Sequence, residues 1–171
     1  MLFSGMIKAI SAPAVKVADE VWVVMALLHR DNPDRSDFTI DEIMDRARQA
    51  KITSDLRPGV YAHVIQHCVA NRAPNSGRYR MLYETQPGRR RLFRTGDTYD
   101  LGREGSKIQP LVDDLPEQYQ DLLKWYRAWC VKAVTLAIKN DPLLALRGSG
   151  KEIWADEHAD DYVRRLREGW E

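Results

Sequence analysis

Apolar residues recur at helical spacing in three successive segments of the N-terminal half of the chain. The pattern predicts a first helix over residues 15–30, ended before Pro33. The motif Thr-Ile-Asp-Glu at 39–42 predicts a capping box, in which the threonine hydroxyl and the glutamate carboxylate bond exposed amides of a first helical turn. A third helix is predicted from Pro58 to about Asn71, because proline at the first helical position gives up an amide that would lack a partner.

Two short strands are expected after the third helix, at Tyr79–Glu84 and Arg91–Arg94. Between them, Gln-Pro-Gly-Arg at 86–89 is a turn signal because proline and glycine are adjacent. Three helices followed by a β-hairpin with a basic tip are the order of a winged helix-turn-helix. The buried face of the third helix is expected to hold Val60, Val64, Ile65, Cys68 and Val69.

A long helix is predicted from Pro116 to about Asn140. Its broad apolar stripe must bury against the domain or pair with its copy in a homodimer. The stripe consists of Leu122, Leu123, Tyr126, Trp129, Cys130, Ala133, Val134, Ala137 and Ile138. Pro142 breaks this helix, and the glycines at 148 and 150 indicate a flexible joint before the C-terminal segment.

The predicted fold is mostly α with a small β-hairpin: a winged helix-turn-helix, a long C-terminal helix and an amphipathic tail. Length and composition allow one compact domain with an attachment. The predicted segments are an N-terminal arm (1–14), a winged-helix DNA-binding domain (15–95), a loop with a long packing or dimerisation helix (96–140), a hinge (141–151) and a tail (152–171).

The net charge of +1 conceals a segregated distribution. Residues 46–94 hold eleven Lys/Arg against Asp55 and Glu84, a local net charge of +9, whereas the segments on either side carry −4 each. Clustered bases gain free energy by releasing the counterions condensed on nucleic acid. Because two acids cannot neutralise eleven bases locally, the block predicts contact with a polyanion. The alternative is a solvated face laced with salt bridges.

The third helix of a winged helix usually enters the major groove, while the wing contacts the backbone. Arg57 and Gln66 are the candidates for base readout because both can bond a base bidentately, and His63 is expected to face DNA or solvent. Three consecutive arginines at 89–91 point to both faces of a strand and cannot all be buried. The alternative is a plain edge strand kept soluble by charge. The candidates for phosphate contact are Arg78, Arg80, Arg89, Arg90, Arg91 and Arg94.

His63 and His67 have the spacing of two metal ligands on one helical face, but no carboxylate or cysteine cluster completes a site. We therefore predict no metal and no cofactor, with both histidines on the outward side of the third helix. A phosphate-cradling glycine loop, a nucleophile elbow and a buried carboxylate pair are all missing, so the sequence predicts a protein that is not an enzyme. Cys68 and Cys130 indicate reduced, buried thiols in a cytoplasmic protein, and no apolar run is long enough for a membrane span.

The C-terminal segment predicts an amphipathic helix with too little apolar surface of its own. Acids precede the helix and arginines fill its last turns, which suits the helix dipole. Tyr162, Leu166 and Trp170 recur at i, i+4 and i+8 on one face, and Trp154 adds a second tryptophan. The segment is therefore expected to bind a partner or to fold back on its own domain.

Residues 148–171 resemble the C-terminal tail of antitoxins that neutralise PIN-domain ribonuclease toxins in type II toxin–antitoxin systems. In those tails G-S-G-K-E-[IL]-W leads into D-x-Y-V-R-R-L-R-x-x-W, and both tryptophans match here. The resemblance implies a tail that wraps the toxin and places an arginine in its acidic metal-binding pocket. The matching positions are Arg164, Arg165 and Arg167, with Trp154, Leu166 and Trp170 as anchors. Such antitoxins commonly carry a ribbon-helix-helix or swapped-hairpin domain, whereas residues 15–94 resemble an uncharacterised winged-helix domain family.

The sequence thus predicts a DNA-binding antitoxin that neutralises a PIN-domain ribonuclease through its tail and binds double-stranded DNA to repress its own operon. The alternative is a stand-alone winged-helix transcriptional regulator, or a DNA-binding module of a defence system or prophage, whose tail serves dimerisation. A protein-interaction scaffold without nucleic acid would leave the basic wing incidental.

Overall fold

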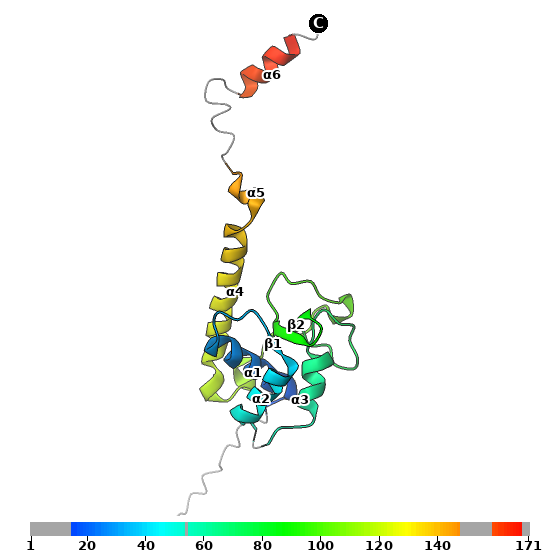
Figure 1. Ribbon diagram of the computed structural model, residues 1–171. Coiled ribbons are helices and arrows are strands. Elements are labelled where there is room, and N and C mark those ends of the chain that lie inside the picture. Colours follow the sequence, from blue (N-terminus) through cyan, green and yellow to red (C-terminus); the bar gives the residue numbers. More distant parts are fainter. Residues whose placement is uncertain (1–14, 54, 148–158, 169–171) are drawn as a thin grey trace, which may run out of the picture. The chain divides into compact units, whose positions relative to one another are not determined.

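A computed structural model describes residues 15–53, 55–147 and 159–168 of the chain (Figure 1). The chain forms two compact units, residues 1–128 and 129–171, and the boundary between them falls within helix α4 (Asp121–Lys139). Helices predominate, as predicted, and the described strands form one small antiparallel sheet. The predicted N-terminal arm lies outside the described residues.

Helix α1 (Val17–Asp31) is the centre of the core in the first unit. Twelve of its fifteen residues are buried, including the whole side chain of Trp22. A helix that is apolar on nearly every side belongs inside a protein, and α1 contacts helices and sheet alike. The prediction of a helix over 15–30 is confirmed to within two residues. Two buried acids on it, Asp19 and Glu20, require cationic partners, because an unpaired charge is costly to bury.

Helix α2 (Ile40–Ala50) begins at the predicted capping box. The Glu42 amide donates to Thr39 Oγ1 at 3.2 Å, and the Thr39 amide donates to Glu42 Oε2 at 2.8 Å. Arg35 binds both oxygens of Glu42, at 2.6 and 3.0 Å. These bonds lower the pKa of Glu42 to about 2, and the bond from Arg35 has the largest effect.

The predicted third helix is shorter than expected and is not a regular α-helix. Helix α3 (Gly59–Ala62) continues as a π-helical turn, η1 (His63–His67), in which the Cys68 amide bonds the His63 carbonyl at 3.0 Å. The chain leaves the helix at Cys68 because its carbonyl bonds the amide of Leu82 in the sheet. Of the predicted buried face, Val60, Val64, Cys68 and Val69 are buried and Ile65 is half-buried.

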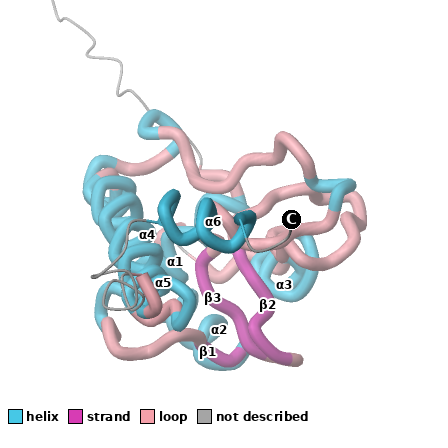
Figure 2. Tube along the Cα trace, turned by 90° about the horizontal axis from the view of Figure 1, so that it is seen from above, coloured by secondary structure: helices cyan, strands magenta, loops and turns pink. Residues whose placement is uncertain are grey.

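The sheet has the order β1–β3–β2 and is antiparallel throughout (Figure 2). Its strands are β1 (Phe38–Thr39), β2 (Leu82–Gln86) and β3 (Arg89–Leu92). The hairpin prediction holds, but both strands reach closer to the turn than expected. Pro87 and Gly88 form the whole connection, with Gly88 at φ 76°, so pairing continues from Gln86 to Arg89. Strand β1 was not predicted, since two residues show no alternation.

Helix α4 begins later than predicted, after a short 3₁₀ turn. Leu122, Leu123 and Tyr126 are buried in the first unit, where the Tyr126 hydroxyl donates to the Phe93 carbonyl and its ring meets Trp22 edge-on. The remaining described helices are η2 (Leu101–Arg103), η3 (Val112–Asp114), η4 (Glu117–Tyr119), α5 (Pro142–Ala145) and α6 (Ala159–Glu168). Helix α5 lies in the segment predicted as a hinge, residues 141–151, so that segment starts with a helical turn. Within the described ranges, no helix has both the length and the apolar character that a bilayer crossing requires.

Candidate nucleic-acid and partner interfaces

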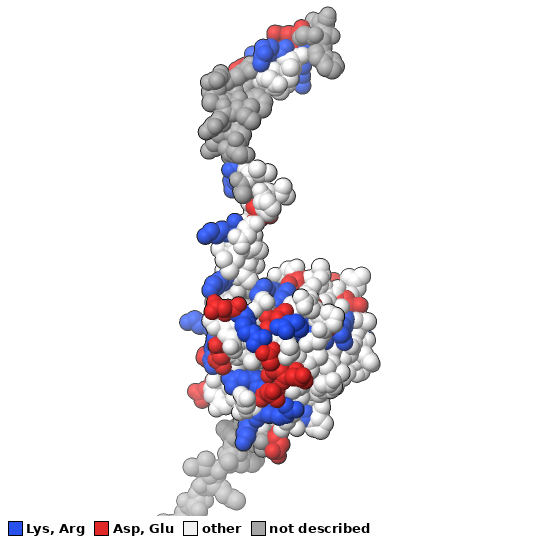
Figure 3. Space-filling view, viewed as in Figure 1, with Lys and Arg blue, Asp and Glu red and all other residues white. Residues whose placement is uncertain are grey.

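Carboxylates bind most of the basic block, and most of these carboxylates lie outside it. Seven of the eleven Lys/Arg in residues 46–94 make ion pairs, and five of the acids that bind them lie outside that block. Figure 3 shows the interleaved basic and acidic side chains over one face of the first unit. The pairs are Arg46–Asp31, Arg48–Asp45, Arg57–Glu20, Arg72–Glu84, Arg89–Asp37, Arg90–Glu84 and Arg91–Asp97. The expectation that the block lacks local neutralisation is therefore wrong, because folding brings distant acids to it.

The three hairpin arginines at 89–91 alternate across the sheet, as a strand requires. Arg90 is buried and donates to Glu84 Oε1 at 2.9 Å. Arg89 binds Asp37 at 2.6 Å. Arg91 binds both oxygens of Asp97, at 2.6 and 2.7 Å, and its guanidinium covers the ring of Tyr83. The exposed tip of the hairpin, residues 86–88, carries no charge, so the predicted basic tip lies on the strand instead.

Candidates on the third helix also point toward the protein. Arg57 donates to Glu20 Oε2 at 2.8 Å, and Glu20 is almost fully buried. Gln66 donates through Nε2 to the carbonyl of Ala73 at 2.7 Å. His63 Nδ1 lies 2.9 Å from the carbonyl of Gly59, and burial lowers the pKa of its imidazole. The side chains predicted to read bases are thus engaged in contacts within the protein.

His63 and His67 lie on the same side of the helix, but that side does not face outward as predicted. Both are half-buried, with ring centroids 4.9 Å apart in an edge-on contact. The loop after the helix passes closely over His67, since a Cβ at Gly77 would lie 2.6 Å from the Cβ of His67. The described part of the chain holds no group of three His, Cys, Asp or Glu that could bind a metal ion.

Two basic residues of the block remain exposed without an ion pair in the described structure. They are Lys51 and Arg78. Arg80 instead donates to the carbonyl of Ser106 at 3.3 Å and lies over the ring of Tyr99. Arg94 is half-buried, and its backbone amide donates to Asp97 at 2.7 Å. Arg78 is therefore the predicted phosphate-binding residue that the fold leaves most accessible.

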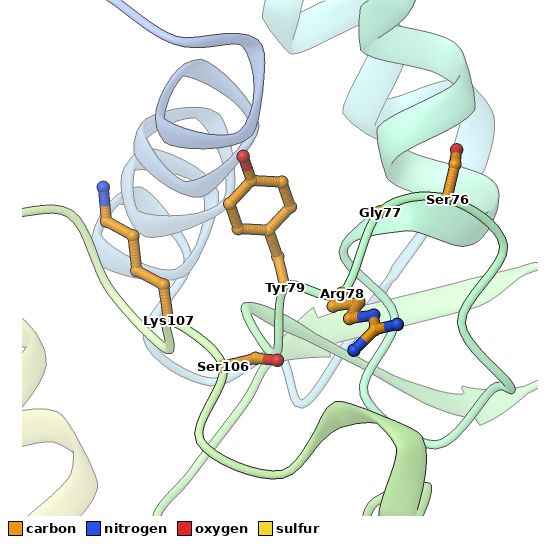
Figure 4. Close-up of a pocket in the computed structure, with 6 residues that line it drawn as sticks. All are labelled: Ser76, Gly77, Arg78, Tyr79, Ser106 and Lys107. Carbon is orange, nitrogen blue, oxygen red and sulfur yellow. The ribbon is translucent and has the colours of Figure 1, made fainter.

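A shallow pocket of about 290 Å³ lies beside Arg78 (Figure 4). Its lining residues are Ser76, Gly77, Arg78, Tyr79, Ser106 and Lys107. The Lys107 amine points away from Arg78 in Figure 4 and binds the carboxylates of Asp19 and Asp114, each at 2.8 Å. Burial raises the pKa of Asp19, against the opposing effect of Lys107. The pocket thus offers an anion one uncommitted guanidinium.

Arg103 is a structural residue that the sequence analysis missed. It is completely buried and donates to the carbonyls of Arg72 at 2.6 Å, His67 at 2.8 Å, Tyr79 at 2.8 Å and Gln66 at 2.9 Å. Two of these carbonyls, those of Gln66 and His67, end the π-helical turn, where carbonyl oxygens and the helix dipole favour a cation. No pattern in the sequence distinguishes this arginine from its solvated neighbours.

The described part of the tail is the helix α6. Arg164, Arg165 and Arg167 are exposed, and Leu166 is 48% exposed. Arg164 binds Asp161 at 3.2 Å, within one turn, and Arg165 lies over the half-buried ring of Tyr162. The predicted anchors Trp154 and Trp170 lie outside the described residues. Helix α6 therefore combines exposed guanidinium groups with an exposed leucine on a single short element.

No family model matches the chain, and the searches of curated proteins and of solved structures likewise found no match.

Proposed function

We propose that this chain is a winged-helix DNA-binding antitoxin whose tail neutralises a PIN-domain ribonuclease. The observation that carries the proposal is α6, which presents three exposed arginines beside an exposed leucine in the segment that resembles such tails. A ribonuclease that holds metal through clustered carboxylates would attract a guanidinium, which can bond two carboxylate oxygens at once. Arginine and apolar anchors commonly dominate interfaces of this kind.

The order of elements supports the winged-helix assignment. Helix α1, strand β1, helix α2, the α3–η1 helix and the hairpin β2–β3 follow one another, and β1 pairs with β3. A small sheet with a hairpin beside a three-helix core is the arrangement that defines a wing. The third helix also exposes Tyr61, at 52%, on the face that would approach DNA.

The ion pairs define how DNA would be bound. Lys51 and Arg78 are available to phosphates at once, whereas Arg89 and Arg91 must exchange Asp37 and Asp97 for the phosphate oxygen. The net gain in binding free energy from each such phosphate contact is small, because an existing ion pair is lost when the contact forms. We therefore expect weak binding to double-stranded DNA with a shallow salt dependence, dominated by few phosphate contacts.

A ribonuclease assay tests the tail. A PIN-domain protein encoded beside this gene is purified, and its RNA cleavage is measured with increasing amounts of the full chain. We expect inhibition at an equimolar ratio, lost in the triple variant R164A/R165A/R167A. Glu168→Gln, on the same helix, is the matched control and should inhibit normally. Full inhibition by the triple variant, or none by the natural chain, contradicts the antitoxin proposal.

The stand-alone regulator is the second candidate function. It has the same DNA-binding half, and one observation favours it: the second half of α4 exposes apolar side chains that suit dimerisation better than they suit solvent. A chain that binds DNA but leaves the ribonuclease fully active would support this candidate. A gel shift at several salt concentrations, with Arg78→Ala as the test variant, measures the DNA-binding half separately.

A further inference from the structure

The second half of α4 and the short α5 expose aliphatic side chains along their length. In the first half of α4 the corresponding stripe is buried at Leu122, Leu123 and Tyr126. Within the part of α4 beyond residue 128 and within α5, six aliphatic side chains are exposed: Val131 66%, Val134 49%, Leu136 49%, Ile138 55%, Leu143 77% and Leu144 46%. Contiguous exposed apolar surface of this kind marks an interaction site.

Three of these residues form a helical seam, which we define as Val131, Val134 and Ile138. Their spacing of i, i+3 and i+7 is the heptad spacing by which two helices pack together, and all three are β-branched. Lys132 and Lys139 each follow a seam residue by one position, so each points about 100° away from it. The seam is therefore a continuous apolar strip with its charges turned aside.

We propose that the seam pairs with the seam of a second copy of the chain, which makes the protein a homodimer through α4. The residues that flank the seam, Thr135 and Ala137, are uncharged. Two copies therefore meet without like-charge repulsion, while no flanking charge is present to select a partner of opposite sign. A two-fold dimer uses the same patch on both copies, and such dimers are the commonest soluble oligomers.

The extent of the surface fits a small dimer. Residues 129–146 span eighteen positions, and only the face that holds the seam can contact the second copy. The interface is therefore smaller than a standard one, which uses roughly 20–30 residues a side. Leu143 and Leu144 of α5 add apolar surface beyond the end of α4. We accordingly expect reversible dimerisation with a dissociation constant on the order of micromolar, rather than an obligate dimer.

This dimer goes beyond the proposed function and does not depend on it. It requires neither a ribonuclease nor DNA. Where the chain does bind DNA, a two-fold dimer would present two copies of the third helix, and the preferred site would be a palindrome.

Sedimentation of the full chain over the micromolar range tests the dimer, with 19.7 kDa as the mass of one copy. We expect the mass to rise toward twice that value with concentration. Val134→Glu should raise the dissociation constant about 100-fold, because a charge would be buried in the seam. Leu136→Glu is the matched control: Leu136 is equally exposed and lies on the opposite side of α4, so its dissociation constant should stay within a few-fold of the natural chain.

Below the dissociation constant, where the chain is a single copy, thermal melts of both variants should match that of the natural chain, since both positions are then exposed. A single-copy mass at every concentration would overturn the proposal. So would a dimer that survives Val134→Glu, because another surface would then hold it, or a dimer that both variants weaken equally. None of these measurements involves the ribonuclease, so the dimer and the antitoxin activity can fail separately.

Discussion

The two units of the chain use their charged and apolar side chains in opposite ways. In the first unit, most of the arginines predicted to contact DNA are bound by carboxylates or carbonyls of the same fold, and Arg78 is the exception. In the second unit, aliphatic residues of α4 and arginines of α6 remain exposed. A basic residue count therefore says little about function until the partners of each side chain are known. Side chains that the fold leaves exposed are better guides to binding.

The largest expected effect on stability is at Arg103, and it tests whether arginines of the first unit serve the fold. If its role is internal, Arg103→Met should lower the free energy of unfolding by about 4 kcal/mol, because several buried carbonyls would lose their donor at once. Denaturant unfolding measures this loss. Arg127→Met, at an exposed position of α4, serves as the control and should change stability by about 0.5 kcal/mol or less. A loss below about 1 kcal/mol at Arg103 would mean that the carbonyls find other donors.

Buried His29 makes the stability of the first unit depend on pH. Its Nε2 accepts the amide of Leu92, and burial, aided by the positive charges of Arg94 and Arg91, lowers its pKa from 6.5 to about 4. As pH falls, the unfolded chain therefore takes up a proton on His29 before the folded chain does. The contribution of neutral His29 to the free energy of unfolding is complete above pH 6.5 and is lost as pH falls from 6.5 to 4. The expected loss is about 3 kcal/mol.

Unfolding experiments across that pH range measure the contribution of His29. His29→Gln keeps an acceptor for the Leu92 amide but has no imidazole to titrate, so its acid loss should be smaller by this amount. An identical pH profile in the natural chain and the variant would show that another group titrates there.

The smallest expected effect concerns DNA and Asp37. This carboxylate binds Arg89 and Thr85, and the bond from Arg89 lowers its pKa. Asp37→Asn should free the guanidinium for phosphate, strengthen DNA binding a few-fold at low salt and steepen the salt slope by about 1. Asp113→Asn makes the same change in net charge at an exposed position and is the control in the gel shift. Equal gains in both variants would indicate a net-charge effect rather than release of Arg89.

Local features of the fold were predictable, and long-range pairings were not. The capping box of Thr39 and Glu42 and the turn at Pro87 and Gly88 depend on residues within four positions, so the sequence displays them directly. The pair of Arg89 with Asp37 joins residues 52 positions apart, and the pair of Arg57 with Glu20 joins residues 37 apart. Periodicity carries no information about such partners.

The same limit applies within the third helix. Its start near residue 58 and most of its buried face were predicted, but the change to π-helical bonding at His63–His67 was not. A period of 3.6 residues does not describe a turn closed by an i to i−5 bond. In α4 the predicted apolar stripe omitted Val131 and Leu136, and its division into buried and exposed halves depends on where the core ends.

The carbonyl contacts of Arg103 have a consequence for how the chain is made. A ribosome delivers residues in order, and the loop at 72–79 acquires its central donor only when residue 103 has emerged. Tyr126, which bonds Phe93, arrives later still. A nascent chain ending at residue 95 would contain helices α1 to α3 and all three strands of the sheet, yet lack the contacts of Arg103 and Tyr126. Expression of a self-standing N-terminal fragment should therefore extend past Tyr126, well beyond the last strand.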